Sequence, residues 1–293
     1  MRVSVVVPAH DAQGTVRRAL QSALDQTRPP DEVVVVDDGS TDATAAVVGE
    51  LGAAVRLVVQ PRGGPSAARN AGIEASTGAW IAFLDADDEW HPAKLERQLE
   101  VATNGVGLVA TDWSREPVRR APPAGIRLTT IDRSDILLLN RFQTSTVLVR
   151  RAVLEAAGGF DPSLDGVEDW DMWLRASEHG KVVKLDWPFV RYADTPSGYS
   201  KALERVYRSG RGMLDRQFGP APGRDERAIL AWHHLRFAVA YLLAGDRRSA
   251  AACLDDCRRA GLVAATPEAA ARHLLPFLAG RARRRLHRSP PLD

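Results

Sequence analysis

The first 112 residues alternate between short apolar runs and segments in which apolar side chains recur at helical spacing. Val3–Pro8 is a continuous apolar run, typical of a strand buried on both faces. From Val16 to Leu24 the apolar residues return every three or four positions, which predicts a helix. The pattern as a whole predicts strands at 3–8, 32–37, 55–60, 80–84 and 106–111, and helices at 16–24, 42 to 49 or 52, 65–75 and 92–102.

This alternation indicates an α/β fold. Strands that are each followed by a helix form a mainly parallel sheet with helices on both faces. In such sheets ligands bind beyond the carboxyl ends of the strands. No G-x-G-x-x-G follows the first strand, and no G-x-x-x-x-G-K-[ST] occurs in the chain. These absences argue against ordinary dinucleotide and P-loop sites.

Polar residues instead gather after each of the first four predicted strands. The groups are, in chain order, Pro8–Asp11, Asp37–Ser40, Gly63–Asn70 and Asp85–Asp88. Because loops that follow successive parallel strands share one edge of the sheet, we expect these groups to converge on one crevice.

The run Asp85–Asp88 holds three carboxylates within four residues. Their mutual repulsion would make burial costly without a counter-charge. A Mn²⁺ or Mg²⁺ ion, which prefers oxygen ligands and is commonly shared with substrate phosphates, removes that cost. The alternative is a solvated turn that caps a helix before Pro92. Arg69 similarly suits a pyrophosphate, or is a surface arginine without a partner.

Composition narrows the class of protein. The chain has 293 residues, 45% of them hydrophobic, which is enough for one large core or two modest ones. It holds no run of about 18 uncharged apolar residues, and its first residues lack the pattern of a signal peptide. The two cysteines, Cys253 and Cys257, are expected to be small buried or half-buried residues of a helix. These features predict a cytoplasmic protein.

The charge is distributed unevenly along the chain. Residues 1–200 carry 21 Lys and Arg against 28 Asp and Glu, whereas residues 201–293 carry 18 against 9. An acidic front half does not suit general nucleic-acid binding. The basic part shows helical spacing at 230–242 and 250–258, which predicts a helical C-terminal region. Its end, Arg281–Arg288, would attract anionic lipid at the inner face of the membrane, or an acidic acceptor; the alternative is a solvated terminus.

Three stretches together resemble the family 2 glycosyltransferases of GT-A fold: VSVVVPAHDA, VVVVDDGSTDAT and PSAARNAGIEASTGAWIAFLDADDEWHPAKLERQL. The resemblance implies a catalytic domain over 1–200, with a nucleotide-binding half at 1–112 and an acceptor half at 113–200, followed by the helical region 201–293. It implies a nucleotide-sugar site made by Pro8, Ala9, His10, Asp38, Arg69, Asn70, Asp85, Ala86 and Asp87. It also implies a metal ion on Asp87 and Asp88. The family usually has Tyr-Asn or similar where this chain has Ala9-His10.

A further stretch, EDWDMWLR from Glu168 to Arg175, resembles the helix of this family that carries its catalytic base. Asp169 matches the base, which would take the proton of an acceptor hydroxyl as the transition state forms. Spacing alone leaves open that Glu168 and Asp169 only favour a helix N-terminus through its dipole. Glu168 and Trp170 are candidates for contact with the sugar or the acceptor, although such aromatic residues are mostly core.

One departure concerns the Tyr-Arg-x-His motif that the family often has near the end of the catalytic domain. Here the segment Val190–Thr195 has no histidine, and Asp194 is the candidate for its place at the metal. The resemblance implies an inverting transferase that moves a sugar from a UDP- or dTDP-type donor to a hydroxyl of a glycan, lipid-linked glycan or natural product. The alternatives are an inactive nucleotide-sugar-binding protein on the same fold and a nucleotidyltransferase, whose glycine-rich basic loop is missing after the first strand.

Overall fold

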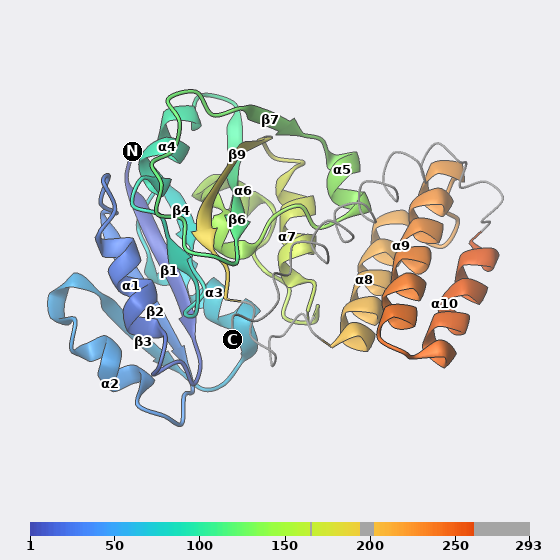
Figure 1. The fold of residues 1–293 in the computed structure, drawn as a ribbon, viewed down its shortest axis with the longest axis horizontal. Coiled ribbons are helices and arrows are strands. Elements are labelled where there is room, and N and C mark those ends of the chain that lie inside the picture. The colour runs from blue at the N-terminus through green and yellow to red at the C-terminus, as the bar shows by residue number, and fades with distance from the viewer. Residues whose placement is uncertain (165, 194–201, 261–293) are drawn as a thin grey trace, which may run out of the picture. The chain divides into compact units, whose positions relative to one another are not determined.

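The structure is a computed structural model that describes residues 1–164, 166–193 and 202–260 (Figure 1). The chain divides into two compact units, Met1–Lys201 and Ala202–Asp293. Asp194 and the segment Arg281–Arg288, for which the sequence suggested roles, lie outside the described residues.

The described residues of the first unit form one sheet of nine strands in the order β3-β2-β1-β4-β8-β6-β9-β5, with β7 paired to β9. The strands are β1 (Val3–Ala9), β2 (Glu32–Asp38), β3 (Arg56–Gln60), β4 (Trp80–Phe83), β5 (Glu89–Trp90), β6 (Val106–Ser114), β7 (Leu128–Ile131), β8 (Leu148–Arg150) and β9 (Lys181–Arg191). The α-helices are α1 (Val16–Leu24), α2 (Thr44–Gly49), α3 (Gly64–Ala75), α4 (Lys94–Val101), α5 (Arg133–Leu138), α6 (Arg151–Ala156) and α7 (Glu168–Ala176). Two short 3₁₀ turns are η1 (Gly52–Ala54) and η2 (Thr144–Thr146).

The parallel half predicted from the sequence is confirmed for β1 to β4, which pair in parallel. Side chains of β2 alternate between two separate apolar layers, as a strand buried on both faces requires. Val33 and Val35 belong to the core that includes residues of α1. Val34 and Val36 pack with Ala68 of α3. Helices therefore cover both faces of this half.

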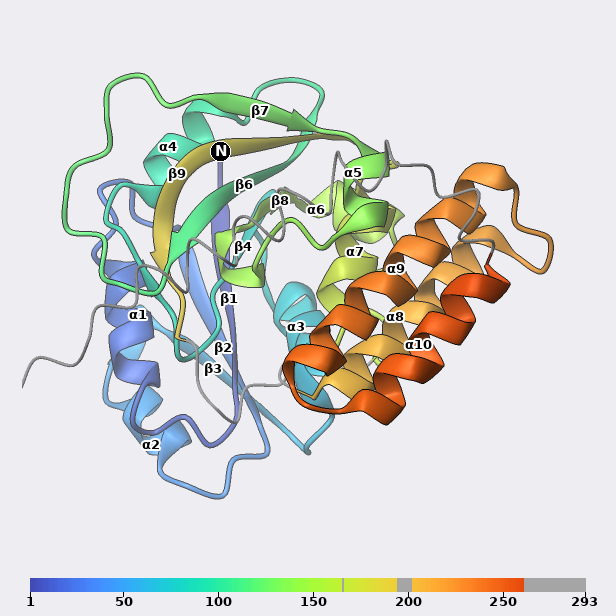
Figure 2. The ribbon, with the colours of Figure 1, turned by 45° about the vertical axis from the view of Figure 1, so that its right-hand side comes forward.

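Beyond β4 the sheet is mixed rather than mainly parallel. β8 inserts antiparallel between β4 and β6, and β9 runs parallel to β6 but antiparallel to β5 and β7 (Figure 2). The described strands thus form four parallel and four antiparallel pairs. The reason is topological: β8 reaches β4 after a connection of more than sixty residues, so no single crossover helix dictates its direction.

Gly72 lets α3 lie close against the sheet, and we expect Gly72→Ala to destabilise the protein by about 1–3 kcal/mol through overpacking. A Cβ added at Gly72 would lie 2.3 Å from Cγ1 of Val6 and 3.3 Å from Cγ2 of Val36. The matched control is Gly14→Ala, because a Cβ at Gly14 meets nothing within 4 Å. Urea unfolding midpoints measure both; equal midpoints for the two variants would contradict the close packing of α3.

In the described part of the second unit, residues 202–260, three helices form: α8 (Leu203–Phe218), α9 (Arg224–Leu243) and α10 (Arg247–Arg259). Their common core includes Phe237, Tyr241 and Cys253. Cys253 and Cys257 are both buried, as expected for small residues of a helix. Among the described helices of the chain, none has the length and apolar character needed to span a bilayer.

Candidate active site

A cleft of about 620 Å³ lies in the first unit and gathers residues from several strand ends. Its lining includes Pro8, Ala9, His10, Asp11, Ala12, Thr15, Asp38, Arg62, Gly64, Pro65, Ala68, Arg69, Asp85, Ala86, Asp87, Gln143, Thr144, Gly166, Glu168, Asp169, Tyr192 and Ala193. The loops after β1, β2, β3 and β4 therefore do converge, together with the start of α7. Most residues selected from the sequence are in this lining.

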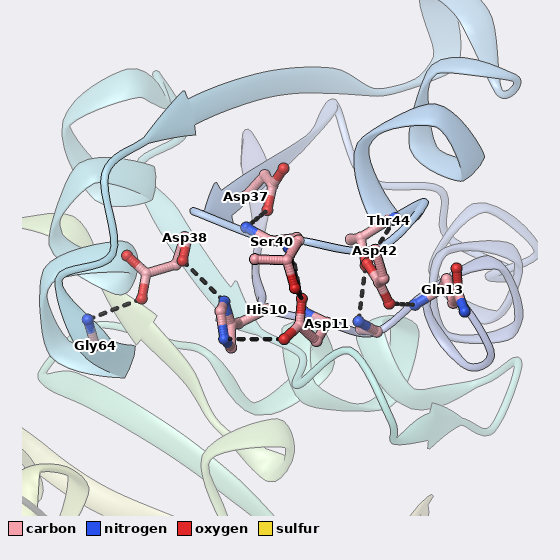
Figure 3. Close-up of polar contacts among 11 residues, drawn as sticks. His10, Asp11, Gln13, Asp37, Asp38, Ser40, Asp42, Thr44 and Gly64 are labelled. Carbon is pink, nitrogen blue, oxygen red and sulfur yellow. Dashed lines mark hydrogen bonds and ion pairs between the residues drawn. The ribbon is translucent and has the colours of Figure 1, made fainter.

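The loops after β1 and β2 are held together by a network of polar contacts (Figure 3). His10 Nδ1 donates to the backbone oxygen of Asp38 at 3.0 Å, and the Asp11 amide donates to Ser40 Oγ at 3.0 Å. Asp11 adopts a left-handed backbone conformation with φ of 46°, which aspartate tolerates better than most residues. The Thr41 amide donates to the carboxylate of Asp11 at 2.7 Å. This network fixes the first wall of the cleft.

Asp38 is 4% exposed, and its carboxylate accepts three hydrogen bonds. Its Oδ1 accepts from Gln60 Nε2 at 2.7 Å and from the Gly63 amide at 2.8 Å, and its Oδ2 accepts from the Gly64 amide at 2.8 Å. A carboxylate offers about four lone-pair positions, so one position on Oδ2 remains for a ligand. Asp38 thereby joins the end of β2 to the glycine-rich start of α3.

Arg69 is a buried cation between two carboxylates of the cleft. Its Nη1 donates to Glu168 Oε1 and its Nη2 to Asp85 Oδ1, both at 3.0 Å. Burial alone lowers the Arg69 pKa, but the charges of Asp85 and Glu168 outweigh it and raise the pKa above its ordinary value. The guanidinium also lies 5.4 Å from the centroid of the Phe160 ring. Arg69 thus connects the loop after β4 to α7.

Asp169 is the second residue of α7, and its carboxylate faces the cleft with defined partners. Its Oδ2 accepts from Asn140 Nδ2 at 2.9 Å and lies 3.5 Å from Thr144 Oγ1. Burial, reinforced by the charge of Glu168, raises the pKa of Asp169 to about 7. A carboxylate with such a pKa can both accept and release a proton near neutral pH.

The aspartates at 85–88 separate into two environments. Asp85 and Asp87 line the cleft, and burial together with the charge of Asp85 raises the pKa of Asp87 to about 6. Asp88 is fully buried and is not among the lining residues; its Oδ1 accepts from the Ala193 amide at 2.8 Å. Burial and the charge of Asp85 raise the pKa of Asp88 to about 8. The structure therefore gives Asp88 a place beneath the cleft floor, not on it.

The chemistry of this donor set fits a divalent cation. Carboxylates outnumber cations on the lining: Asp11, Asp38, Asp85, Asp87, Glu168 and Asp169 face Arg62 and Arg69. Within the described residues, no three His, Cys, Asp or Glu side chains are grouped so that they could hold an ion by themselves. Mg²⁺ is commonly bound by one or two carboxylates, and phosphate oxygens and water complete its coordination shell.

Besides Asp88, two residues selected from the sequence do not line the cleft, Asn70 and Trp170. Asn70 binds both backbone groups of Phe160: its Nδ2 donates to the carbonyl at 2.8 Å and its Oδ1 accepts from the amide at 2.9 Å. Trp170 is 2% exposed, and its Nε1 donates to the carbonyl oxygen of Ile136. A nucleotide contact by Asn70 and a sugar platform at Trp170 stay predictions that this geometry does not favour.

The cleft also contains residues that the sequence did not single out. Arg62 is exposed on the lining and, among the described residues, has no hydrogen bond or ion pair. Tyr192 lines the cleft beside Trp113, with ring centroids 5.2 Å apart. Asn140 orients Asp169 from the loop after α5. Of these, only Arg62 could have been selected from the sequence, because it lies next to the glycine pair at the start of α3.

Comparison with known proteins places this cleft in a family. An uncharacterised glycosyltransferase of Nostoc is 34% identical over 187 residues, which cover 59% of this chain and 56% of the relative. Among solved structures, S. aureus TarS 1–349 in complex with UDP-GlcNAc has a TM-score of 0.67 at 21% identity, covering 89% of this chain and 81% of that one. The mannosyltransferase PcManGT from Pyrobaculum calidifontis, in complex with GDP-Man and Mn²⁺, has a TM-score of 0.62 at 23% identity, covering 98% and 81%.

These similarities show the fold to be GT-A, as the sequence predicted. The chain spans 56%, 32% and 40% of the length of the first three curated relatives that it matches. The sequence profile of glycosyl transferase family 2 matches residues 4–154, just over half of the chain and the part that supplies Asp38, Arg69 and Asp85. The chain therefore belongs to glycosyl transferase family 2.

Proposed function

We propose that this protein transfers a sugar from a nucleoside-diphosphate donor to a hydroxyl of an acceptor, with inversion at the anomeric carbon and with Asp169 as the general base. One observation carries the proposal. Asp169 lies in the same cleft as the strand-end loops that bear Asp38 and Asp85, and burial raises its pKa to about 7. A half-buried carboxylate of this kind, held by Asn140, suits proton removal from an alcohol.

The donor end of the proposed reaction rests on the loops after β1, β2 and β3. Pro8, Ala9 and His10 form one wall, and Asp38 offers its remaining acceptor position to an N–H of the base. Both solved relatives described above hold nucleotide sugars, with a uracil and a guanine base respectively. The donor base is therefore open between a pyrimidine, as the sequence suggested, and guanine.

The charge of the cleft sets a condition for binding a diphosphate. Carboxylates exceed guanidinium groups on its lining, so a doubly charged donor is repelled unless a cation joins it. Asp85 and Asp87 are the residues that would hold a divalent ion. The structurally similar PcManGT is in complex with Mn²⁺. Such an ion, when bound, neutralises the charge that develops on the leaving diphosphate. A contact of Asp88 with this ion stays a prediction that its burial outside the lining does not favour.

The protein's own residues supply orientation and the proton acceptor. Glu168 accepts from Arg69 and from the Gly166 amide, which fixes the start of α7. The carboxylate of Asp169 then takes the proton as the acceptor oxygen bonds to the anomeric carbon. Because attack by the acceptor itself displaces the diphosphate in one step, the configuration inverts.

We expect Asn140→Ala to move the pH dependence of transfer to higher pH. The amide of Asn140 donates to Asp169 and so lowers its pKa, although burial and Glu168 raise it more. Without that donor the pKa of Asp169 rises further, and the base is protonated up to a higher pH. Rates measured from about pH 5 to about pH 9 should therefore fall more at neutral than at alkaline pH. The surface variant Asn104→Ala is the control; an unchanged profile for Asn140→Ala would argue against the contact.

The function itself is tested by binding and turnover of donors. We expect UDP, dTDP or GDP to raise the melting temperature, more strongly with Mn²⁺ than with EDTA. We also expect the wild type to release nucleoside diphosphate from the matching nucleotide sugar. Binding without release, in both wild type and Asp169→Asn, would instead support an inactive nucleotide-sugar-binding protein. No shift with any nucleotide would contradict the proposal altogether.

A further inference from the structure

A second hollow of about 340 Å³ lies in the first unit, outside the cleft. Ser114 at the end of β6, Pro188 of β9 and the segment 117–120 line it. The loop from 115 to 127 that covers it joins β6 to β7 and carries Arg115, Arg119, Arg120 and Arg127 against a single acid, Glu116. This is a local excess of positive charge within a half of the chain in which acids predominate.

The charged lining residues of this hollow are two arginines without a counter-charge. Arg119 and Arg120 form no hydrogen bond or ion pair through their guanidinium groups with any residue that the structure describes. The carboxylate of nearby Asp186 is already paired with Arg127 and with Lys184, 2.8 Å away. Asp112 is likewise paired with Lys184. In the described parts of the chain, Arg127 and Lys184 are thus paired with acids, whereas Arg119 and Arg120 are not.

An aromatic ring fixes one of the two cations. The guanidinium carbon of Arg120 lies 4.2 Å from the centroid of the Trp187 ring. Stacking of this kind orients the planar group while leaving its N–H donors available in the ring plane. The Arg119–Arg120 pocket is therefore a site with a partly ordered set of donors and an apolar wall of Pro117, Val118 and Pro188.

The pocket is next to the cleft. The amide of Tyr192, which lines the cleft, donates to the carbonyl oxygen of Ser114, which lines the pocket, at 2.8 Å. Tyr192 also packs against Trp113, the chain neighbour of Ser114. Because a single hydrogen bond joins their linings, the two hollows suit one acceptor longer than a single sugar. An anionic group of that acceptor would be repelled by the carboxylates of the cleft, but would be attracted by Arg119 and Arg120.

We propose that the Arg119–Arg120 pocket binds an anionic group, a carboxylate or a phosphate, of an oligomeric acceptor whose reacting hydroxyl lies in the cleft. This inference rests on the proposed transferase function and adds a substrate class to it. The shared chemistry is an oxyanion that accepts from guanidinium donors.

The test is direct binding of fluorescent oligosaccharides to the full chain, followed by anisotropy. The probes are a hyaluronan tetrasaccharide, which carries carboxylates, a glycerol phosphate tetramer, which carries phosphates, and neutral chitotetraose. We expect one anionic probe to bind, with salt weakening it, and R119Q/R120Q to weaken it by about tenfold. R17Q/R258Q removes the same number of charges from exposed residues that pair with surface acids elsewhere, and should change affinity by less than about twofold.

Each outcome has a definite meaning. Binding of the carboxylate probe or of the phosphate probe identifies the source of the anion. Absence of binding by both anionic probes, equal binding of chitotetraose, or an equal loss in R17Q/R258Q would overturn the proposal. Release of nucleoside diphosphate from the donor is measured separately, since R119Q/R120Q should leave transfer to water unchanged. If the wild type releases no nucleoside diphosphate from any donor, the result counts against the transferase function. If neither anionic probe binds, the result counts against the pocket.

Discussion

Asp169→Asn is expected to lower sugar transfer by about 10²- to 10⁴-fold, the usual contribution of a positioned general base. The amide has nearly the same shape, and its oxygen can still accept from Asn140 Nδ2, although the hydrogen bond from the Trp170 amide to Asp169 Oδ1 is lost. Nucleotide binding, which we assign to the loops after β1 to β4, should be unchanged. The measurement is the turnover number with saturating donor, together with the melting-temperature shift caused by the nucleotide.

The same substitution should make the protein more stable at alkaline pH. Burial raises the pKa of Asp169 to about 7 in the folded state, above its ordinary value of 3.8. The folded protein therefore binds a proton more tightly than the unfolded chain, and stability falls as the pH rises from about 4 to about 7. The amide of Asp169→Asn carries no charge, so this loss disappears. A melting temperature higher by about 2–4 °C at pH 8, and similar at pH 4, is expected; a lower one at pH 8 would argue that Asp169 is not held in a costly ionised form.

The local pattern of apolar residues was sufficient to predict the first half of the fold. β1, β2 and α1 begin and end within one residue of their predicted bounds, because buried strands and amphipathic helices have distinct periods. The insertion of β8 next to β4 was not predictable in the same way. It depends on packing between segments distant in the chain, and a three-residue strand leaves too short a pattern to reveal its partner.

The candidate site was predictable where charge or motif marks a strand end, and not where packing decides. Asp38 reaches the cleft as the last residue of β2 and Asp169 as the second residue of α7, whereas Arg69 reaches it from the first half of α3. Asn70 follows Arg69 directly in the sequence, yet its position on α3 turns it toward the backbone of Phe160. Asn140 was missed because its role is visible only once the loop after α5 is placed beside Asp169.

Arg69→Met is expected to cause the largest loss of stability among these substitutions, about 3–5 kcal/mol. Arg69 is 5% exposed and is the cation that pairs with both Glu168 and Asp85. Methionine fills a comparable volume but leaves two carboxylates without their counter-charge in a poorly solvated place. Urea unfolding is the measurement. The control is Arg17→Met, whose partner Glu50 is at the surface, and which should cost less than about 1 kcal/mol.

A double variant separates lost charge pairing from lost packing. Glu168→Gln added to Arg69→Met removes one of the unpaired charges, so the double variant should recover part of the stability that the single variant loses. A loss that is not relieved by Glu168→Gln would mean that Arg69 acts through its packing against Phe160 rather than as the cation between the loop after β4 and α7.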